Sequence, residues 1–461
     1  MSGSAAVLGV ILSRKFGHGV KTDGFFAAFG IYLALVLVAS SLRVIVLPRF
    51  VAARVSVRLG HEVGTWGVGL AAPLAVVVVV SIVWPHTIAS WLTSSPSAGD
   101  QAAVLLPWVV VSAVAQIFGG LVASGLAALD DYVWAAFGFA FGSIAGVVLT
   151  LVLVDHGVVA FGWGLALNGA LSLAIPLAAL VLRRGVAAPD ARIGRRLLQL
   201  GEGVAVPLAL QGLYVIAYRF ASGLGTGRAT TFSYAYLIAA FLVAVTAASA
   251  ALVTTVPFAR EGSSPHRVAR HVVAISWLSL AVVAAAAGVF ALAGESIVRR
   301  VLGSGYGGGT GAELGRLVVY LAPWMVASVA LTVAYPLVFV RGRAWWLPLL
   351  AGAAVVAHAL LEWLLRDAFG LAGVAVGLGV TTALVLVVLL AWLGAAVAAL
   401  RGIVIAAATC GVVALAAFGL PRLVLAPVAA AVSGLILYGA LLAVWRPAGL
   451  RHAFGYMRDL N

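Results

Sequence analysis

The feature that most constrains this chain is its series of continuous apolar runs, which recur from one end to the other. A helix needs about 20 apolar residues to cross a bilayer, whereas a membrane-barrel strand alternates apolar and polar residues. Only 9% of the residues are charged and 64% are hydrophobic, while a soluble domain needs about a quarter charged residues. The sequence therefore predicts an all-α polytopic membrane protein.

Thirteen runs are long enough to span the membrane, and a shorter apolar segment at residues 2–13 precedes them. A helix over that first segment would reach only about 18 Å, so we expect it to be clipped or interfacial. With it, the prediction is about fourteen transmembrane helices. The thirteen runs cover approximately residues 25–47, 65–83, 103–128, 132–154, 158–182, 203–221, 231–256, 272–293, 317–340, 344–365, 371–392, 402–420 and 423–444.

The basic residues indicate an orientation. The net charge is +14, and most arginines fall in alternate connections together with the C-terminal tail, as the positive-inside rule describes. We therefore expect both termini to be cytoplasmic and predict no nucleic-acid partner. The one cysteine, Cys410, excludes an intramolecular disulfide.

Two stretches repeat in the second half of the chain. The segment 14–49, a glycine-containing turn followed by a long apolar helix that we expect to stop at Pro48, is echoed from Arg219 onward when Pro48 is aligned with Pro257. A later segment matches in the same way, with Gly157 on Gly370. The aligned residues are separated by 257 − 48 = 209 positions in the first match and by 370 − 157 = 213 in the second. Two matches with nearly the same separation predict an internal repeat.

The repeat predicts two pseudo-symmetric six-helix lobes, at residues 1–185 and 186–400, followed by two extra helices and a cytoplasmic tail at 401–461. Because six is even, both lobes insert the same way up. This is the parallel-repeat arrangement of transporters, in which the substrate path lies between the halves.

One motif carries a family resemblance. The run Thr22-Asp23-Gly24-Phe25-Phe26-Ala27-Ala28-Phe29, after its glycine-bearing turn, resembles the corresponding run of the MurJ/MviN lipid II flippases. Two further segments, 233–260 and 314–343, resemble the eighth and tenth helices of that family. The resemblance implies the fold of the multidrug/oligosaccharidyl-lipid/polysaccharide (MOP) exporter superfamily and alternating access around a central cavity.

The resemblance also implies a substrate and a setting. A flippase of this kind moves a lipid-linked oligosaccharide across the bacterial cytoplasmic membrane for peptidoglycan or polysaccharide biosynthesis, beside cell-wall synthesis enzymes as possible partners. The family carries charged pairs in its first and eighth helices, where this chain has Leu8, Gly9, Tyr236 and Leu237. The sugar is therefore left open, and the alternatives are a multidrug/cation antiporter of the same fold and a non-transporting scaffold.

Arginines inside spans are the candidate substrate-binding residues. A guanidinium group matches the geometry of phosphate and does not deprotonate, so we expect Arg43 and Arg219 to bind a pyrophosphate. The alternative is that each side chain extends to the headgroups. Arg14, Lys21 and Asp23 of the first turn either sense the head group or brace the turn.

An acid and a histidine form the candidate coupling site. His358 and Glu362 are four residues apart, on one face of a helix, where they can relay protons or bind Na⁺. The alternative is that Glu362 pairs with Arg366 near the surface. We predict no catalytic residue, metal site or cofactor, and leave open coupling to H⁺, Na⁺ or the membrane potential.

Overall fold

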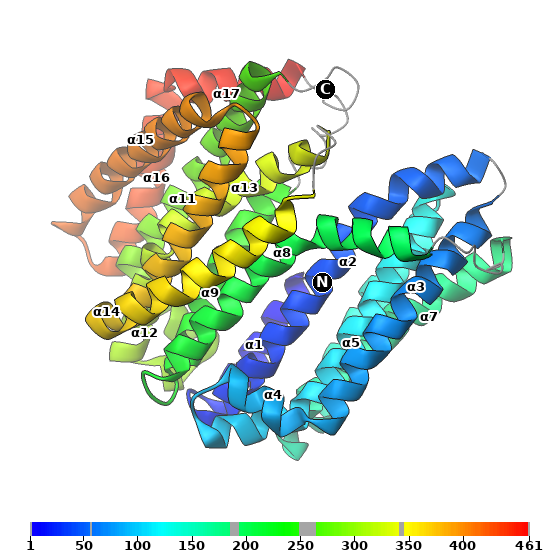
Figure 1. Ribbon diagram of the computed structural model, residues 1–461. Helices are drawn as coiled ribbons and strands as arrows, with labels where there is room; N and C mark the ends of the chain where they lie inside the picture. The colour runs from blue at the N-terminus through cyan, green and yellow to red at the C-terminus, as the bar shows by residue number, and fades with distance from the viewer. Residues whose placement is uncertain (1, 56–57, 185–192, 249–263, 341–344, 460–461) are drawn as a thin grey trace. The chain divides into compact units, whose positions relative to one another are not determined.

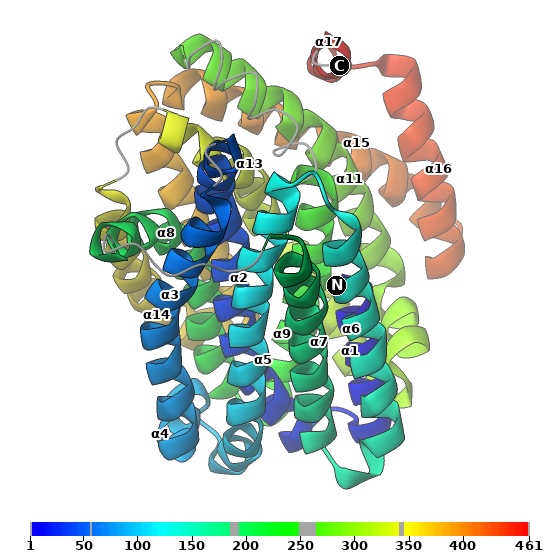
Figure 2. The same cartoon turned by 90° about the vertical axis from the view of Figure 1, so that its right-hand side faces the viewer.

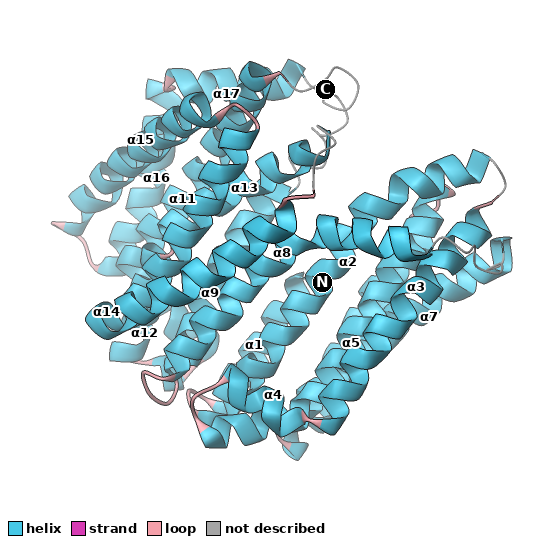
Figure 3. Cartoon of the chain, viewed as in Figure 1, coloured by secondary structure: helices cyan, strands magenta, loops and turns pink. Residues whose placement is uncertain are grey.

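The computed structural model describes residues 2–55, 58–184, 193–248, 264–340 and 345–459 (Figure 1). Within these ranges every regular element is a helix, as the sequence predicts, and no strand is present (Figure 3). The chain divides into two compact units: residues 1–230 with 345–355, and residues 231–344 with 356–461. The predicted lobe boundary at 185–186 lies outside the described residues.

Unit 1 contains α1 (Ser2–Phe16), α2 (Val20–Val55), α3 (Leu59–Val83), α4 (Pro85–Leu92), α5 (Pro96–Ala128), α6 (Val133–Leu153), the 3₁₀ turn η1 (Val154–His156), α7 (Val159–Arg184), α8 (Ile193–Ser222) and the start of α9 (Arg228–Val243). Unit 2 contains the rest of α9, the π-helical turn η2 (Ala244–Ala248), α11 (Pro265–Leu302), η3 (Ser304–Tyr306), α12 (Gly309–Tyr320), α13 (Ala322–Val340), most of α14 (Leu347–Trp392), α15 (Ala396–Arg422), α16 (Pro427–Trp445) and α17 (Ala448–Asp459).

In unit 1, α5 is the central helix and packs against both α2 and α7, while α7 pairs with α6 (Figure 2). The α6–α7 contact is close because glycines leave room for the opposite backbone. A Cβ added at Gly142 would lie 2.8 Å from the Asn168 carbonyl oxygen, and one at Gly146 would lie 2.5 Å from that of Gly164. Small residues therefore allow these helices to pack tightly where no hydrophobic effect drives them together.

In unit 2, α11 takes the central position and packs against α12, α13, α15, α16 and α17. The helix pair α12–α13 is bent by 42° at the short break between its two helices. The bent pair covers the predicted span at 317–340, so that span exists but is not a single straight helix.

The repeat is visible in the backbone of each unit. Gly157, which separates α6 from α7, has φ of 91°, and its aligned partner Gly370, which interrupts α14, has φ of 57°. Both values lie in the left-handed region that favours glycine. Seven residues later, Gly164 packs on α6 at Thr150, and Gly377 packs on the first part of α14 at Glu362. The two segments thus form equivalent helical hairpins.

Eleven of the described helices are long and apolar enough to cross a membrane, or twelve with the bent pair. Gly370 divides α14 into the two spans predicted at 344–365 and 371–392, and α1 corresponds to the short first segment. The described helices thus agree with the predicted polytopic fold. The prediction that the first long helix stops at Pro48 is wrong, because α2 continues to Val55.

Candidate functional site

The first glycine turn is closed by its own threonine. Gly17 has φ of 67°, and the Thr22 hydroxyl accepts a hydrogen bond from the Gly19 backbone N–H at 3.0 Å. The same hydroxyl lies 2.9 Å from the Gly19 carbonyl oxygen and 3.1 Å from that of Gly17. Since the first N–H groups of a helix have no partner within it, this fully buried threonine fixes where α2 begins.

The next residue, Asp23, binds the N-terminus of another helix. One carboxylate oxygen accepts a hydrogen bond from the Gly227 N–H at 2.7 Å. The other accepts from the Thr230 N–H at 3.0 Å and the Thr230 hydroxyl at 2.6 Å. Asp23 is 3% exposed and lies at the positive end of the α9 dipole, where a carboxylate is stabilised. It therefore acts as an N-terminal cap supplied by a residue that is distant in the sequence.

The two glycine turns that the repeat aligns also contact each other. The His18 ring lies so close to Gly227 that an added Cβ would be 2.0 Å from its Cε1 atom, and Gly227 has φ of 81°. Tyr218, which is 1% exposed, donates a hydrogen bond from its hydroxyl to the Asp23 carbonyl oxygen. We call Asp23, Tyr218, Gly227 and Thr230 the turn clasp, because they join the α1–α2 turn to the α8–α9 turn.

The phenylalanines of the motif are core residues. Phe25, Phe26 and Phe29 are 3%, 1% and 6% exposed, and their rings contact one another. Phe25 also meets Phe161 of α7 edge-on, at 5.5 Å between ring centroids. The motif therefore combines an aspartate that caps α9 with aromatic rings that pack α2 into unit 1.

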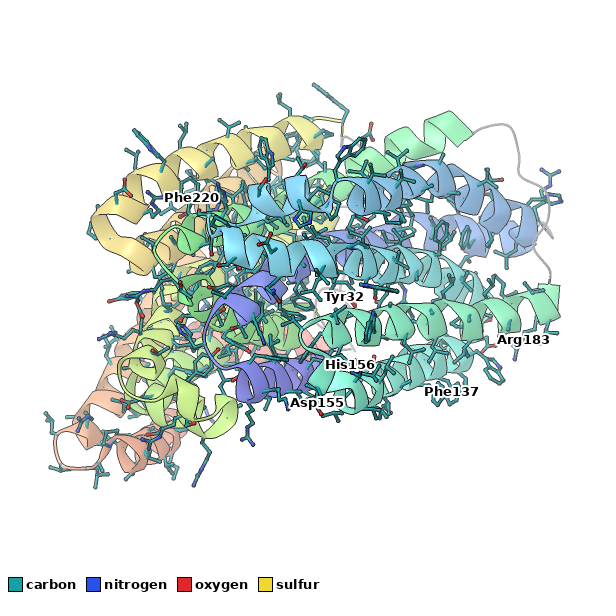
Figure 4. All side chains as sticks on the ribbon, turned by 90° about the horizontal axis from the view of Figure 1, so that it is seen from below. Tyr32, Phe137, Asp155, His156, Arg183 and Phe220 are labelled. Carbon is teal, nitrogen blue, oxygen red and sulfur yellow. The ribbon has the colours of Figure 1, made fainter. Side chains whose placement is uncertain are left out.

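The basic residues of the first turn are exposed. The Lys21 ammonium lies 5.3 Å from the Phe16 ring centroid, and Arg14 is also exposed. Lys15 forms a 2.7 Å ion pair with Asp155, which lies beside His156 at the η1 end of α6–α7, while Arg183 is at the other end (Figure 4). The turn thus lies at the η1 end of unit 1 and displays cations there.

Arg219, the first of the two predicted substrate ligands, is held by the loop before α5. Its guanidinium Nη1 donates to the Ser94 hydroxyl at 2.7 Å. Ser222 supports the same loop, because its hydroxyl accepts from the Ser94 N–H at 2.9 Å and donates to the Arg219 carbonyl oxygen at 2.7 Å. The guanidinium has four further N–H donors, so a serine hydroxyl leaves it the capacity to bind an anion.

Arg43, the second predicted substrate ligand, lies on α2, about five and a half helical turns beyond Asp23. Its side chain is exposed, while its neighbours Leu42 and Val46 are fully buried. Among the described residues, none forms a hydrogen bond or an ion pair with Arg43. The structure therefore leaves this guanidinium accessible and does not place it beside Arg219.

The predicted coupling pair is brought together and is buried. His358 and Glu362 are both 0% exposed, with His358 Nε2 at 3.5 Å from Glu362 Oε1. The His358 Nδ1 atom lies 3.1 Å from the Thr381 hydroxyl, and both oxygens of Glu362 lack a hydrogen-bond partner among the described residues. The alternative pairing with Arg366 is wrong, because the Arg366 Nε donates to Asp367 at 2.8 Å and Glu362 is not at the surface.

Sequence reasoning missed four residues that complete these clusters: Ser94, Tyr218, Thr230 and Thr381. The glycine-rich segment before Thr230 signals a helix start, but nothing local shows that Asp23 caps it. Tyr236 of α9 packs against Trp324 of α13 with 4.9 Å between ring centroids.

Helices that are long and apolar enough to span a bilayer define an all-α polytopic membrane protein. No protein-family model matches the sequence, and no curated protein sequence matches it. Solved structures do match. The chain resembles the lipid II flippase MurJ in its inward closed conformation with a TM-score of 0.76 and 12% identity, over 96% of both chains.

Two further structures share the fold. An inward-facing multidrug resistance MATE-family transporter of the MOP superfamily matches with a TM-score of 0.67 and 16% identity, over 86% of this chain and 94% of that one. The second is a MOP superfamily transporter from Pyrococcus furiosus that is described as having a binding pocket of reverse polarity. It matches with a TM-score of 0.56 and 16% identity, over 87% of this chain and 94% of that one. The chain thus has the MOP exporter fold, and the predicted resemblance to MurJ/MviN is confirmed at that level.

Proposed function

We propose that this protein is a flippase that moves a polyprenyl-pyrophosphate-linked sugar across the bacterial cytoplasmic membrane by alternating access, with both termini cytoplasmic. The observation that carries the proposal is the fold likeness to a lipid II flippase over 96% of both chains. Because one fold hosts several functions, the substrate has to be argued from side chains. The membrane arginines supply that argument.

Arg43 and Arg219 are the proposed ligands of the pyrophosphate. Arg43 has no anionic partner among the described residues, and Arg219 is held only by a neutral serine in the contacts described above. A charged side chain in a span is costly unless it has a function or reaches water. Binding of a phosphate would replace the neutral serine partner with an anion, which the guanidinium can contact through two parallel hydrogen bonds and which binds it more strongly.

The first turn has a supporting role in this proposal. Asp23 caps α9 and has its oxygens occupied by donors, so it positions the turn rather than binding an anion directly. Lys21 and Arg14 are exposed on that turn and are the groups that meet the head group.

We propose that His358 and Glu362 couple transport to a cation. A buried carboxylate without hydrogen bonds is expensive in its ionised form. It is therefore neutralised by a bound proton, by a cation or by protonation of His358. Thr381 holds the other nitrogen of His358 in place, so the histidine presents Nε2 to the acid.

Flipping in proteoliposomes tests the proposal. The purified protein is reconstituted with a fluorescent polyprenyl-pyrophosphate sugar, and the label exposed in the outer leaflet is quenched over time. Arg43→Ala and Arg219→Ala should each slow flipping at least tenfold. Arg422→Ala is the matched control, because Arg422 is exposed and contacts the Leu425 carbonyl oxygen. If the wild-type protein flips no such lipid, the proposal is wrong.

A multidrug/cation antiporter is the second candidate. Two observations favour it: the likeness to a MATE transporter and a buried carboxylate in unit 2. Testing a deletion strain against cationic drugs separates the two functions. If the protein is an antiporter, the deletion strain should be more sensitive to the drugs, and the Glu362→Gln variant should fail to restore resistance. If it is a flippase, the deletion strain should instead show a cell-envelope defect.

A further inference from the structure

The last helix of the chain lies across the others. In both views α17 runs crosswise to the axis of α16, over the end at which α16 finishes (Figures 1 and 2). The change of direction occurs at Arg446, whose backbone is left-handed with φ of 44°, followed by Pro447. At 12 residues, α17 is too short to span a bilayer.

One face of α17 is fixed to α11. Leu450 and Ala453 are 9% and 0% exposed, and a Cβ at Gly449 would lie 2.2 Å from the Trp277 ring. The Tyr456 hydroxyl lies 3.0 Å from the His271 Nδ1 atom of α11. These positions recur every three or four residues, so they form one helical face. The orientation of α17 on unit 2 is therefore fixed.

The opposite face carries cations and an apolar side chain. Arg451 and Arg458 are exposed on it, and Phe454 between them is 63% exposed. The one acidic residue of α17 is Asp459, at its last position. A phenylalanine exposed beside arginines, on a helix lying across the end of the spans, is the pattern of an interfacial amphipathic helix.

The neighbouring helix ends add to this charge. Arg270, near the start of α11, and Arg401, near the start of α15, are exposed. Both starts lie at the end of unit 2 that α17 covers, because α17 packs on the start of α11 and α15 forms a hairpin with α16. Arg446 is exposed at the same end. These like charges at one end of unit 2 favour an anionic partner there.

We propose that the outer face of α17 binds the anionic phospholipid headgroups of the adjacent leaflet, with Arg451 and Arg458 on the phosphates and Phe454 inserted among the upper acyl carbons. An arginine beside a membrane is attracted to an anionic leaflet, and its fork-shaped guanidinium matches a phosphate. The spans already bring α17 to the membrane surface, so a lipid is available without any further binding event. This interaction does not depend on what the protein transports.

A probe on Phe454 tests the proposal in the full chain. Cys410 is the one cysteine and is buried, so Cys410→Ser with Phe454→Cys gives a single site for an environment-sensitive fluorophore. The protein is reconstituted in vesicles of phosphatidylcholine alone or mixed with phosphatidylglycerol. We expect a blue-shifted emission and quenching by brominated lipid that are stronger in the mixed vesicles and weaken at high salt, which screens charges.

Charge variants identify the cause of the shift. Arg451→Gln with Arg458→Gln should remove the dependence on phosphatidylglycerol, while Arg451→Lys with Arg458→Lys should retain most of it. The charge-matched control is Arg316→Gln with Arg422→Gln, two exposed arginines elsewhere in unit 2. This control should behave as the labelled parent protein does.

Two outcomes would overturn the proposal. A probe with the same emission in both vesicle types would show that anionic lipid is not recognised. A phosphatidylglycerol effect that survives the double glutamine variant would assign the effect to other groups. If the glutamine variant fails to fold, the lysine variant and the salt titration still distinguish charge-dependent binding from its absence. A probe that becomes shielded only when an acidic protein is added would point to a protein partner instead.

Discussion

Asp23 and Thr230 are far apart in the sequence, yet the Asp23 carboxylate receives both the backbone N–H and the hydroxyl of Thr230, at 3.0 and 2.6 Å. This contact joins the two turns that the internal repeat aligns. The first N–H groups of a helix have no hydrogen-bond partner within the helix, and a carboxylate there accepts hydrogen bonds from them. Its negative charge also interacts favourably with the positive end of the helix dipole. The turn clasp therefore holds the start of α9 on α2.

The first prediction concerns this carboxylate. Asp23→Ala leaves the Gly227 and Thr230 donors buried without an acceptor, and hydrogen bonds to charged groups contribute about 1.5–3 kcal/mol each. We expect a lower midpoint of thermal unfolding in detergent, with Asp23→Asn intermediate because it keeps one acceptor oxygen. Asp100→Asn is the control, since Asp100 is exposed and its ion pair with His86 is 3.6 Å long. An unchanged midpoint for Asp23→Ala would refute the capping role.

The second prediction concerns Gly227. Alanine there is strained by the positive φ, which costs about 1–2 kcal/mol, and its Cβ would overlap the His18 ring. We expect Gly227→Ala to lower the unfolding midpoint. Gly212→Ala in α8, where nothing lies within 4 Å, should leave it unchanged or raise it, because alanine is the better helix former by about 1 kcal/mol.

A double variant separates the two causes in Gly227→Ala. Adding His18→Ala removes the overlap and leaves the backbone strain, so it should recover part of the loss. A Gly227→Ala protein as stable as the wild type would contradict the close contact between the two turns.

The third prediction separates structure from substrate binding at Arg219. Ser94→Ala removes the hydrogen bond from the guanidinium to a neutral hydroxyl but leaves the charge in place, and because the pair is exposed the cost should be about 1 kcal/mol. We expect Ser94→Ala to flip lipid nearly as well as the wild type and Arg219→Ala to be strongly impaired. Equal impairment in both variants would mean that Arg219 serves only to hold the loop before α5.

The fourth prediction concerns coupling. Glu362→Gln keeps the shape of a buried side chain and removes its charge, so the protein should fold and remain at least as stable as the wild type. Flipping driven by an imposed pH or Na⁺ gradient should fall, while passive equilibration persists. Glu202→Gln, at a partly buried position in α8, is the isosteric control. Unchanged gradient-driven flipping in Glu362→Gln would remove this acid from the coupling mechanism.

The spans and hairpins could be predicted from the sequence because their signals are local. Apolar runs mark the helices, and Gly157 and Gly370 mark equivalent hairpin turns. The pairing of His358 with Glu362 was also predictable, since residues four apart on a helix share a face.

The contacts that complete the sites could not be predicted in the same way. Ser94 approaches Arg219 from a loop 125 residues earlier, and Asp23 reaches α9 across 207 residues. Such pairs depend on how helices pack, which the apolar pattern does not specify. The continuation of α2 beyond Pro48 could not be predicted for a related reason: neighbouring helices can stabilise a proline within a membrane helix that would break an isolated one.

The central claim is that the guanidinium groups of Arg43 and Arg219 carry the pyrophosphate of a lipid-linked sugar. The most direct measurement is the initial flipping rate of a polyprenyl-pyrophosphate sugar in proteoliposomes containing Arg43→Ala, because Arg43 forms no hydrogen bond or ion pair with a described residue that its loss would break. The account predicts a rate at least tenfold below that of wild type and of Arg422→Ala, with an unchanged unfolding midpoint. A wild-type rate for Arg43→Ala would contradict it.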